Sequence, residues 1–370
     1  MTEKHLTAKE LYAFVKTQHG GFHRHGFTDH AYLYNLYFPP PALIDHLKNQ
    51  MPDLIRNYPV AQQDLAELVG QATGIPGQRL VVGNGAAELI KIICTAVSQR
   101  LIVPVPSFNE YINAAPRGQA ATFALAPPDF RLDPERLVRE AIAARADTAV
   151  VVSPNNPTAL AVPARDLQWL ATRLASRNIR LIVDESFIDF CDTKGVFSLE
   201  SCLDRHPNLS VIKSMSKSYG ICGLRLGYLA THDEDLLDRL RQGVHIWNIN
   251  GFAEEFLRQL PGFADQFHQS CAKVVRDRDA LFRDLSRIPD LTVYPTDANF
   301  LFCRLPDTTP PAPAVVAQLF ISHNILVKDC SGKSMPVADR YLRIAARTPE
   351  ENRTLASALA STLDTVLEVE

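Results

Sequence analysis

Residues 214–228, SMSKSYGICGLRLGY, have the residue types of a binding site for an aldehyde that carries a phosphate. A lysine in cationic or apolar surroundings has a lowered pKa and can form a Schiff base with an aldehyde, which is the chemistry that Lys217 offers. Ser214 and Ser216 precede this lysine, and Arg225 follows it by eight positions. Two hydroxyls and a guanidinium can together bind a phosphate dianion, and this combination is too specific for a chance surface loop.

Three further motifs follow predicted strands and supply complementary groups. Residues 83–88, GNGAAE, lead directly into a helix whose free backbone N–H groups suit a phosphate, although such a segment is more often only a turn. In residues 153–158, SPNNPT, Asn156 either donates to an anionic ligand or forms an Asn-Pro turn. Asp184 ends a buried strand, where its carboxylate needs a cationic partner, either a protonated ring nitrogen or an arginine.

The elements that must position these motifs alternate along the middle of the chain. Short β-branched runs predict four strands buried on both faces, at residues 101–105, 148–152, 179–183 and 209–212. Helical patterns lie between or before them, at residues 86–97, 133–144 and 165–177. Such alternation predicts an α/β fold with a mostly parallel sheet between helices, and a ligand at the carboxyl ends of its strands.

The pattern changes after about residue 260, which divides the chain into three expected parts. We expect an N-terminal arm at residues 1–50, a large domain at residues 51–260 and a small α+β domain at residues 261–370. The small domain begins with a charge-rich helix at residues 263–286 and strands at residues 291–294 and 299–303, followed by a Pro-rich linker at residues 306–313. A helix, strands at residues 325–328 and 341–345, and a final helix from residue 349 complete it. The arm has too little apolar periodicity to fold alone, so we expect it to pack on the small domain.

Composition and charge exclude several classes of protein. The chain has 370 residues, of which 46% are hydrophobic and 21% charged, with 38 basic and 41 acidic side chains, so disorder and a coiled coil are excluded. The near-neutral charge gives no footprint for nucleic acid or an anionic membrane. No long apolar run or leader occurs, and the seven cysteines are irregularly spaced, which predicts a cytoplasmic protein. The histidines at positions 19, 23, 25 and 30 lack an ordered spacing, so no metal is expected.

The motifs together match an electron-sink cofactor, which needs a lysine imine, an acid opposite a pyridinium nitrogen and a phosphate clamp. On this basis the chain resembles pyridoxal-phosphate enzymes of the aspartate-aminotransferase fold, known as fold type I, within the class I and II aminotransferases. It is most similar to the branch of threonine-phosphate decarboxylases and histidinol-phosphate aminotransferases. The resemblance extends from about His19 to the last helix, and it implies a seven-stranded type of large sheet.

The resemblance implies a role for each residue of the cofactor site. Lys217 would carry pyridoxal 5'-phosphate as a Schiff base, Asp184 would keep its ring nitrogen protonated, and Asn156 would bond its ring oxygen. Phe108 would stack on the pyridine ring. The cofactor phosphate would be bound by Gly85, Ala86, Ala87, Ser214, Ser216 and Arg225, together with Tyr58 of a neighbouring subunit. The last role implies a homodimer with composite active sites, in which the N-terminal arm also packs on the partner.

The resemblance also implies substrate contacts. Arg343 occupies the position of the arginine that grips a substrate carboxylate. Arg347 and the His19-Gly-Gly segment resemble the corresponding residues of threonine-phosphate decarboxylases. In that family the His-Gly-Gly segment helps to hold the substrate phosphate. Asn35 is retained from a family motif that residues 33–38 otherwise replace. Residues 184–187, DESF, lack the tyrosine that histidinol-phosphate aminotransferases usually carry. The implied substrate is an anionic amino acid.

Two reaction types remain open, because they differ only in which bond at Cα stands perpendicular to the cofactor ring. The resemblance favours decarboxylation of an O-phosphorylated amino acid, as in L-threonine-O-3-phosphate decarboxylases. Transamination of the histidinol-phosphate type is the alternative, and a non-catalytic binding protein that has kept the fold is a remote one. The rotation of one bond in the bound substrate separates the two reactions.

Overall fold

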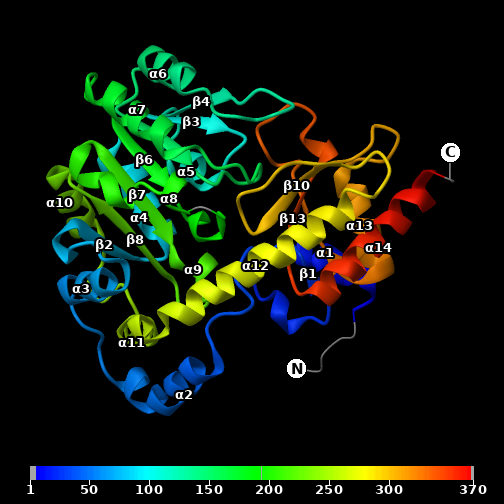
Figure 1. The fold of residues 1–370 in the computed structure, drawn as a ribbon, viewed down its shortest axis with the longest axis horizontal. Helices are drawn as coiled ribbons and strands as arrows, with labels where there is room; N and C mark the ends of the chain where they lie inside the picture. Colours follow the sequence, from blue (N-terminus) through cyan, green and yellow to red (C-terminus); the bar gives the residue numbers. More distant parts are fainter. Residues whose placement is uncertain (1–5, 193, 368–370) are drawn as a thin grey trace.

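The structure, a computed structural model, describes residues 6–192 and 194–367. Figure 1 shows a large lobe built on one broad sheet and a small lobe built on a narrower one. The long helix α12 (Ala264–Leu285) runs from one lobe to the other, and it occupies the place of the expected charge-rich helix.

Seven strands form the large sheet: β2 (Leu80–Asn84), β3 (Leu101–Val105), β4 (Ala120–Ala124), β5 (Thr148–Val152), β6 (Arg180–Asp184), β7 (Leu209–Ser214) and β8 (Leu226–Thr231). Their order is β2-β8-β7-β6-β5-β3-β4. β8 is antiparallel to both of its neighbours, and the other four pairs are parallel. The predicted, mostly parallel sheet is confirmed, and the carboxyl ends of β6 and β7 lie side by side.

Helices cover both faces of this sheet: α2 (Pro41–Arg56), α3 (Gln62–Thr73), α4 (Ala86–Ile92), α5 (Glu110–Ala114), α6 (Pro134–Ala143), α7 (Ala164–Ala175), α8 (Lys194–Phe197), α9 (Met215–Ser218), α10 (Glu234–Gly243) and α11 (Gly251–Gln259). The Asp133 carboxylate starts α6 by accepting the backbone N–H groups of Glu135 and Arg136, with Pro134 at the first helical position. The helix expected at residues 86–97 becomes a π-helix from Ile93 to Val97.

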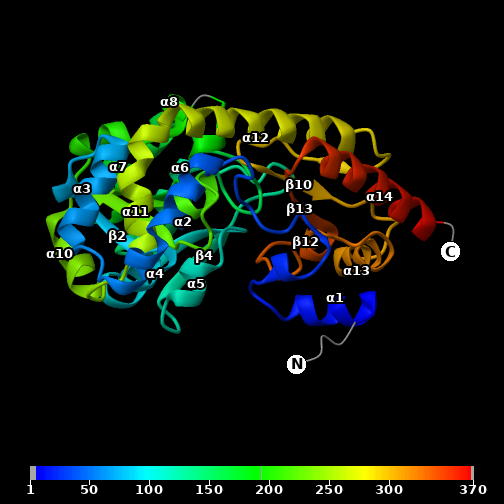
Figure 2. The same cartoon turned by 90° about the horizontal axis from the view of Figure 1, so that it is seen from below.

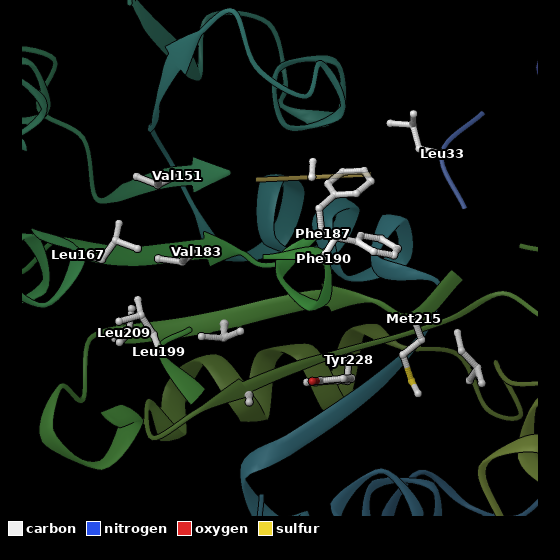
Figure 3. Close-up of a cluster of buried hydrophobic side chains, with 14 of the residues drawn as sticks. Leu33, Val151, Leu167, Val183, Phe187, Phe190, Leu199, Leu209, Met215 and Tyr228 are labelled. Carbon is white, nitrogen blue, oxygen red and sulfur yellow. The ribbon is translucent and has the colours of Figure 1, made fainter. Parts of the chain in front are cut away.

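Alternate residues of the central strands face two different cores. Val151 and Val183 pack with Leu167 of α7 in one cluster, which Figure 3 shows in close-up. Their neighbours Val150 and Ile182 belong to a second cluster on the opposite face. Because successive side chains of a strand point to opposite faces, a strand buried on both faces is apolar at consecutive positions, as residues 149–152 of β5 are.

The small lobe contains a four-stranded antiparallel sheet in the order β12-β13-β10-β9: β9 (Thr292–Val293), β10 (Phe300–Arg304), β12 (Lys328–Asp329) and β13 (Tyr341–Ala345). Helices α13 (Ala312–His323) and α14 (Pro349–Leu367) complete it. The single strand expected at residues 325–328 is divided at Val327. Its first half, β11 (Ile325–Leu326), pairs with a strand of the N-terminal segment instead.

The N-terminal segment is shared between the lobes. Helix α1 (Ala8–Lys16) contacts α13, and β1 (Thr28–Asp29) pairs with β11 in parallel. Figure 2 shows α1 beside the small lobe and α2 against the large lobe, where α2 contacts α11. The boundary expected at residue 50 therefore falls inside α2, because the amphipathic helix continues to Arg56.

Candidate active site

Lys217 lies at the carboxyl end of the large sheet, on the short helix α9 that follows β7. Burial lowers the pKa of its ammonium group, and the positive charges of Arg343 and Arg225 lower it further. No carboxylate within the described part of the chain forms an ion pair with Lys217, although Asp184 is near enough to oppose the shift. The site thus holds a lysine that is readily deprotonated to a nucleophilic amine.

Asp184, at the end of β6, is held by three hydrogen-bond donors. The Ser186 backbone N–H and hydroxyl donate to its Oδ1 at 3.0 and 2.6 Å, and the Tyr111 hydroxyl donates to its Oδ2 at 3.1 Å. Burial raises the pKa of Asp184, while these hydrogen bonds and the charge of Lys217 lower it. The carboxylate is therefore fixed in one orientation, buried, and without a cation in ion-pair contact among residues 6–192 and 194–367.

Tyr111 is a site residue to which the sequence reasoning assigned no role. It is fully buried in α5, and its hydroxyl has Asp184 as hydrogen-bond partner, 73 positions away in the sequence. Its ring lies edge-on to that of Phe108, with centroids 6.5 Å apart. A buried tyrosine hydroxyl needs a hydrogen-bond partner, and its position three residues after the expected stacking ring was the available signal.

Groups that suit a phosphate come together where α4 begins. Gly85 has φ +71°, a conformation that L side chains rarely adopt, so glycine is favoured there, and the guanidinium of Arg225 lies against it. The Gly85 N–H donates to the Arg225 carbonyl at 2.9 Å, which brings residues 85–87 next to the lysine motif. The Ser216 hydroxyl is buried without a hydrogen-bond partner in the described residues, and Arg225 makes no ion pair there. Ser214, partly exposed, lies beside them at the end of β7.

Arg343 links the expected cofactor residues to the expected substrate side. Its Nη1 donates to the Asn156 side-chain oxygen at 2.9 Å, and its Nη2 donates to the Ala31 carbonyl at 2.6 Å. Its Nε–H has no partner in the described chain. Burial lowers the pKa of Arg343, and Asp29 is near enough to oppose this. The Nε–H is therefore a buried donor without an acceptor among the described residues.

A cavity of about 530 Å³ lies beside these residues, between the lobes. Phe108 and Asn156 of the large lobe line it, and Arg343 lines it from the small lobe. His19 is an exposed side chain at the same cavity, to which α1 contributes Tyr12 and Lys16. The structure therefore places Phe108, Asn156, Arg343 and His19 around one space.

Most of the predicted site residues, Lys217 and Asp184 among them, do not line this cavity. Arg347, Asn35 and Tyr58 are three of these, and each has other partners. Arg347 is engaged by Glu351 and by the Asp29 carbonyl, both at 2.9 Å. The buried Asn35 amide donates to the Ser218 carbonyl and the Ser270 hydroxyl at 2.9 and 2.7 Å, so its side chain supports the segment that follows Lys217. Tyr58 is 76% exposed and stacks on Trp247 with ring centroids 4.2 Å apart.

Comparisons with known proteins agree with this geometry. A family model described as aminotransferase class I and II matches residues 42–359. The chain is 43% identical over 352 residues to CMP-5'-(3-aminopropyl)phosphonate synthase of Streptomyces rubellomurinus, covering 95% of this chain and 55% of that protein. It thus spans only about half the length of that relative, and 57% of an uncharacterized protein of Sinorhizobium fredii.

A second relative matches over most of its own length. L-serine phosphate decarboxylase of Sulfurospirillum multivorans is 29% identical over 349 residues, covering 90% of this chain and 88% of that protein. A solved structure of a decarboxylase from the same organism superposes with a TM-score of 0.81 at 28% identity, covering 95% of this chain and 98% of that one.

Proposed function

The chain belongs to the class I and II aminotransferase family, and we propose that it decarboxylates an amino acid carrying a second anionic group, such as an O-phosphorylated amino acid. The family depends on pyridoxal phosphate, so the enzyme class and the cofactor follow from membership. The similarity to L-serine phosphate decarboxylase, which covers 90% of this chain, carries the proposed reaction. The first relative is named for an aminopropyl compound, and an amine is what remains when an amino acid loses its carboxylate.

The residues present fit pyridoxal phosphate. The unpartnered Ser216 hydroxyl, the Arg225 guanidinium and the backbone at Gly85 form a cradle for its phosphate, with Ala86, Ala87 and Ser214 beside it. The buried Asp184 carboxylate needs a cation, which a protonated pyridine ring would provide. When bound, the cofactor supplies an aldehyde for the substrate amine and a ring that accepts the electrons left at Cα.

Four side chains of this protein would direct the reaction. Asp184 would keep the ring nitrogen protonated. Lys217, whose pKa is lowered by burial, would hold the cofactor aldehyde and, once the substrate has bound, move a proton to or from Cα. Arg343 would orient the substrate carboxylate, and its hydrogen bond to Asn156 limits its own rotation. Decarboxylation would require the carboxylate, rather than the Cα hydrogen, to stand perpendicular to the ring.

The reaction is tested by following CO₂, amine and keto acid together. We expect O-phospho-L-serine or O-phospho-L-threonine to release CO₂ and an amine in equal amounts, with no keto acid added. Serine and threonine are the matched controls and should react much more slowly, because they lack the second anion. Stoichiometric consumption of an amino donor with a keto acid, and no CO₂, would instead establish transamination and disprove the proposal.

We further propose that the active protein is a homodimer. Apolar side chains gather on α2 and on the segment before α11: Ile44, Met51, Ile55, Tyr58, Ile246 and Trp247, each at least 37% exposed. Ile246 is 78% and Ile55 is 68% exposed, which is unusual for isoleucine on a monomer surface. A second copy of the chain would cover this surface, and Tyr58 would then reach the partner's cofactor phosphate.

Dimerisation is tested with one surface variant. Ile246→Asp should shift the sedimentation of the protein towards the monomer, because it buries a charge in the interface.

Site sharing is tested with two impaired variants. Lys217→Ala and Tyr58→Ala each impair a different half of a composite site, so mixed and refolded proteins should recover part of the activity. A monomeric wild-type protein, or no recovery in a mixture that contains heterodimers, would contradict a shared site.

We also propose a cytoplasmic location. In the described residues no helix is long and apolar enough to cross a membrane. All seven cysteines are free thiols, and six of them are buried, which suits a reducing compartment.

A further inference from the structure

Lys333 lies in the loop between β12 and β13 and lines the same cavity as Arg343 and Phe108. Its Nζ donates to the Ser107 carbonyl at 2.7 Å and to the Asn109 side-chain oxygen at 3.0 Å. The Asn109 amide donates back to the Gly332 carbonyl at 3.2 Å. The small lobe is therefore attached, through Lys333, to the loop of the large lobe that carries Phe108.

The ammonium of Lys333 has one N–H bond left after these two contacts. Within residues 6–192 and 194–367 no carboxylate forms an ion pair with it. The charged and titratable groups nearest to it are Arg343 on β13, Lys328 on β12, and Cys330. The same cavity is also lined by Asp329 of β12, by Glu110 of α5, by Tyr12 and Lys16 of α1, and by His19 and Tyr32. Burial lowers the pKa of Lys333 to about 8, and the charges of Arg343 and Lys328 contribute. An anion that binds beside Lys333 would stabilise the protonated, charged form of its side chain.

Arg343 and Lys333 both present positive charge to the cavity, and they are near enough for the charge of Arg343 to lower the pKa of Lys333. Arg343 is bonded to Asn156, on the loop that follows β5, whereas Lys333 is bonded to the loop that follows β3. A ligand with two anionic groups would satisfy both cations. The compact charge of an ammonium suits a phosphoryl or phosphonyl oxygen, while the guanidinium fork suits a carboxylate.

We propose that Lys333 binds the phosphoryl or phosphonyl group of the substrate and selects doubly anionic amino acids over singly anionic ones. This inference rests on the proposed function for the identity of the carboxylate-bearing ligand. Because Lys333 also contacts Ser107 and Asn109, the bound anion holds the two lobes together across the cavity. Lys333 is thus a specificity-determining residue, and it takes no part in the bond-breaking step.

The test measures ligand binding separately from reaction. The measurement is calorimetric titration with O-phospho-L-serine and with L-serine, and all proteins are cofactor-loaded and carry Lys217→Ala so that no reaction occurs. In this background, adding Lys333→Met should lower the affinity for the phosphorylated ligand by about 30-fold. Its affinity for serine should change less than about threefold. Lys328→Met, an exposed lysine of the same cavity, is the matched control and should lose less than about fivefold.

The pH dependence supplies a second readout that a folding defect cannot imitate. Phosphate monoesters are dianions above about pH 6, so the ligand phosphate keeps its charge from pH 7 to 9.5. Lys333 loses its proton as the pH rises through about 8, and affinity for O-phospho-L-serine should fall over that range. In Lys333→Arg the affinity should stay nearly constant over this pH range, in contrast to wild type, because an arginine stays protonated.

Three outcomes overturn the proposal. These are equal losses for phosphorylated and unphosphorylated ligands, equal losses in Lys333→Met and Lys328→Met, or an unchanged pH dependence in Lys333→Arg. Failure of the proposed function is a separate result, since it would show as phosphate-dependent binding through Lys333 without release of CO₂. Thermal unfolding of each variant identifies those that have not folded. If Lys333→Met is one of them, the pH dependence of binding in Lys333→Arg tests the proposal instead.

Discussion

Replacing Lys217 with arginine is expected to lower kcat by about 10⁴-fold or more, while the fold is retained. Arginine keeps the positive charge but forms no Schiff base and does not give up its proton near neutral pH. CO₂ release from O-phospho-L-serine is the measurement of the loss. Borohydride reduction of the cofactor-loaded wild-type protein, followed by peptide mapping, should place the cofactor on Lys217.

Lys213 is the control for this assignment, because it is also a buried lysine at the same end of the sheet. Its Nζ forms an ion pair with Asp189 at 2.9 Å, and Asp189 raises its pKa well above the usual value against the effect of burial. Lys213 is therefore held as a cation, whereas burial lowers the pKa of Lys217. Lys213→Arg should keep the reducible adduct. An adduct that persists in Lys217→Arg would show that another lysine carries the cofactor.

Asp184→Asn is expected to lower kcat by about 10³-fold, because a neutral amide no longer holds a proton on the ring nitrogen. The change preserves shape. The Ser186 N–H and hydroxyl can still donate to Oδ1, and the Tyr111 hydroxyl, which donates to Oδ2 in the wild type, can instead accept from the new NH₂ group. The melting temperature of the variant should therefore stay close to that of wild type. Single-turnover kinetics of CO₂ release measures the chemical step itself.

Tyr111→Phe provides a graded comparison for Asp184. It removes one of three donors to the carboxylate and keeps the ring that packs against Phe108, so the expected loss is about tenfold. Tyr111 is a positioning residue, and Asp184 faces the cofactor itself. If the two variants lost the same activity, the charge of Asp184 would not be what the reaction requires.

The central parallel strands could be predicted from local sequence, and so could the edge of the sheet at which the candidate site residues lie. The central residues of β5 and β6, at 149–152 and 181–183, are apolar on both faces, and the residues that follow such strands must lie at one edge of a parallel sheet. Residues 325–328 could not be divided in the same way. Their composition fits one strand, and only the presence of β1 on one side and β13 on the other assigns the halves to different sheets.

The cofactor residues were found because their motifs are short and contiguous. The lysine, its flanking hydroxyls and Arg225 lie within 12 positions of one another, and no folding is needed to see the combination. Asn35 and Arg347 show the limit of this reasoning. Both match a family position by type, yet in the structure their side chains bond Ser270 and Glu351, and neither lines the cavity.

The sequence by itself determined the fold class, and it predicted Lys217 as the reactive lysine together with the group of residues that fits a phosphate. The tertiary structure decided which polar side chains support that group and which face the substrate. Tyr111 reaches Asp184 across 73 positions, and Lys333 reaches Ser107 across 226. The physical reason is that the roles of these residues come from hydrogen bonds and charges between distant segments. Local propensity does not encode such contacts, and they exist only once the two lobes have packed.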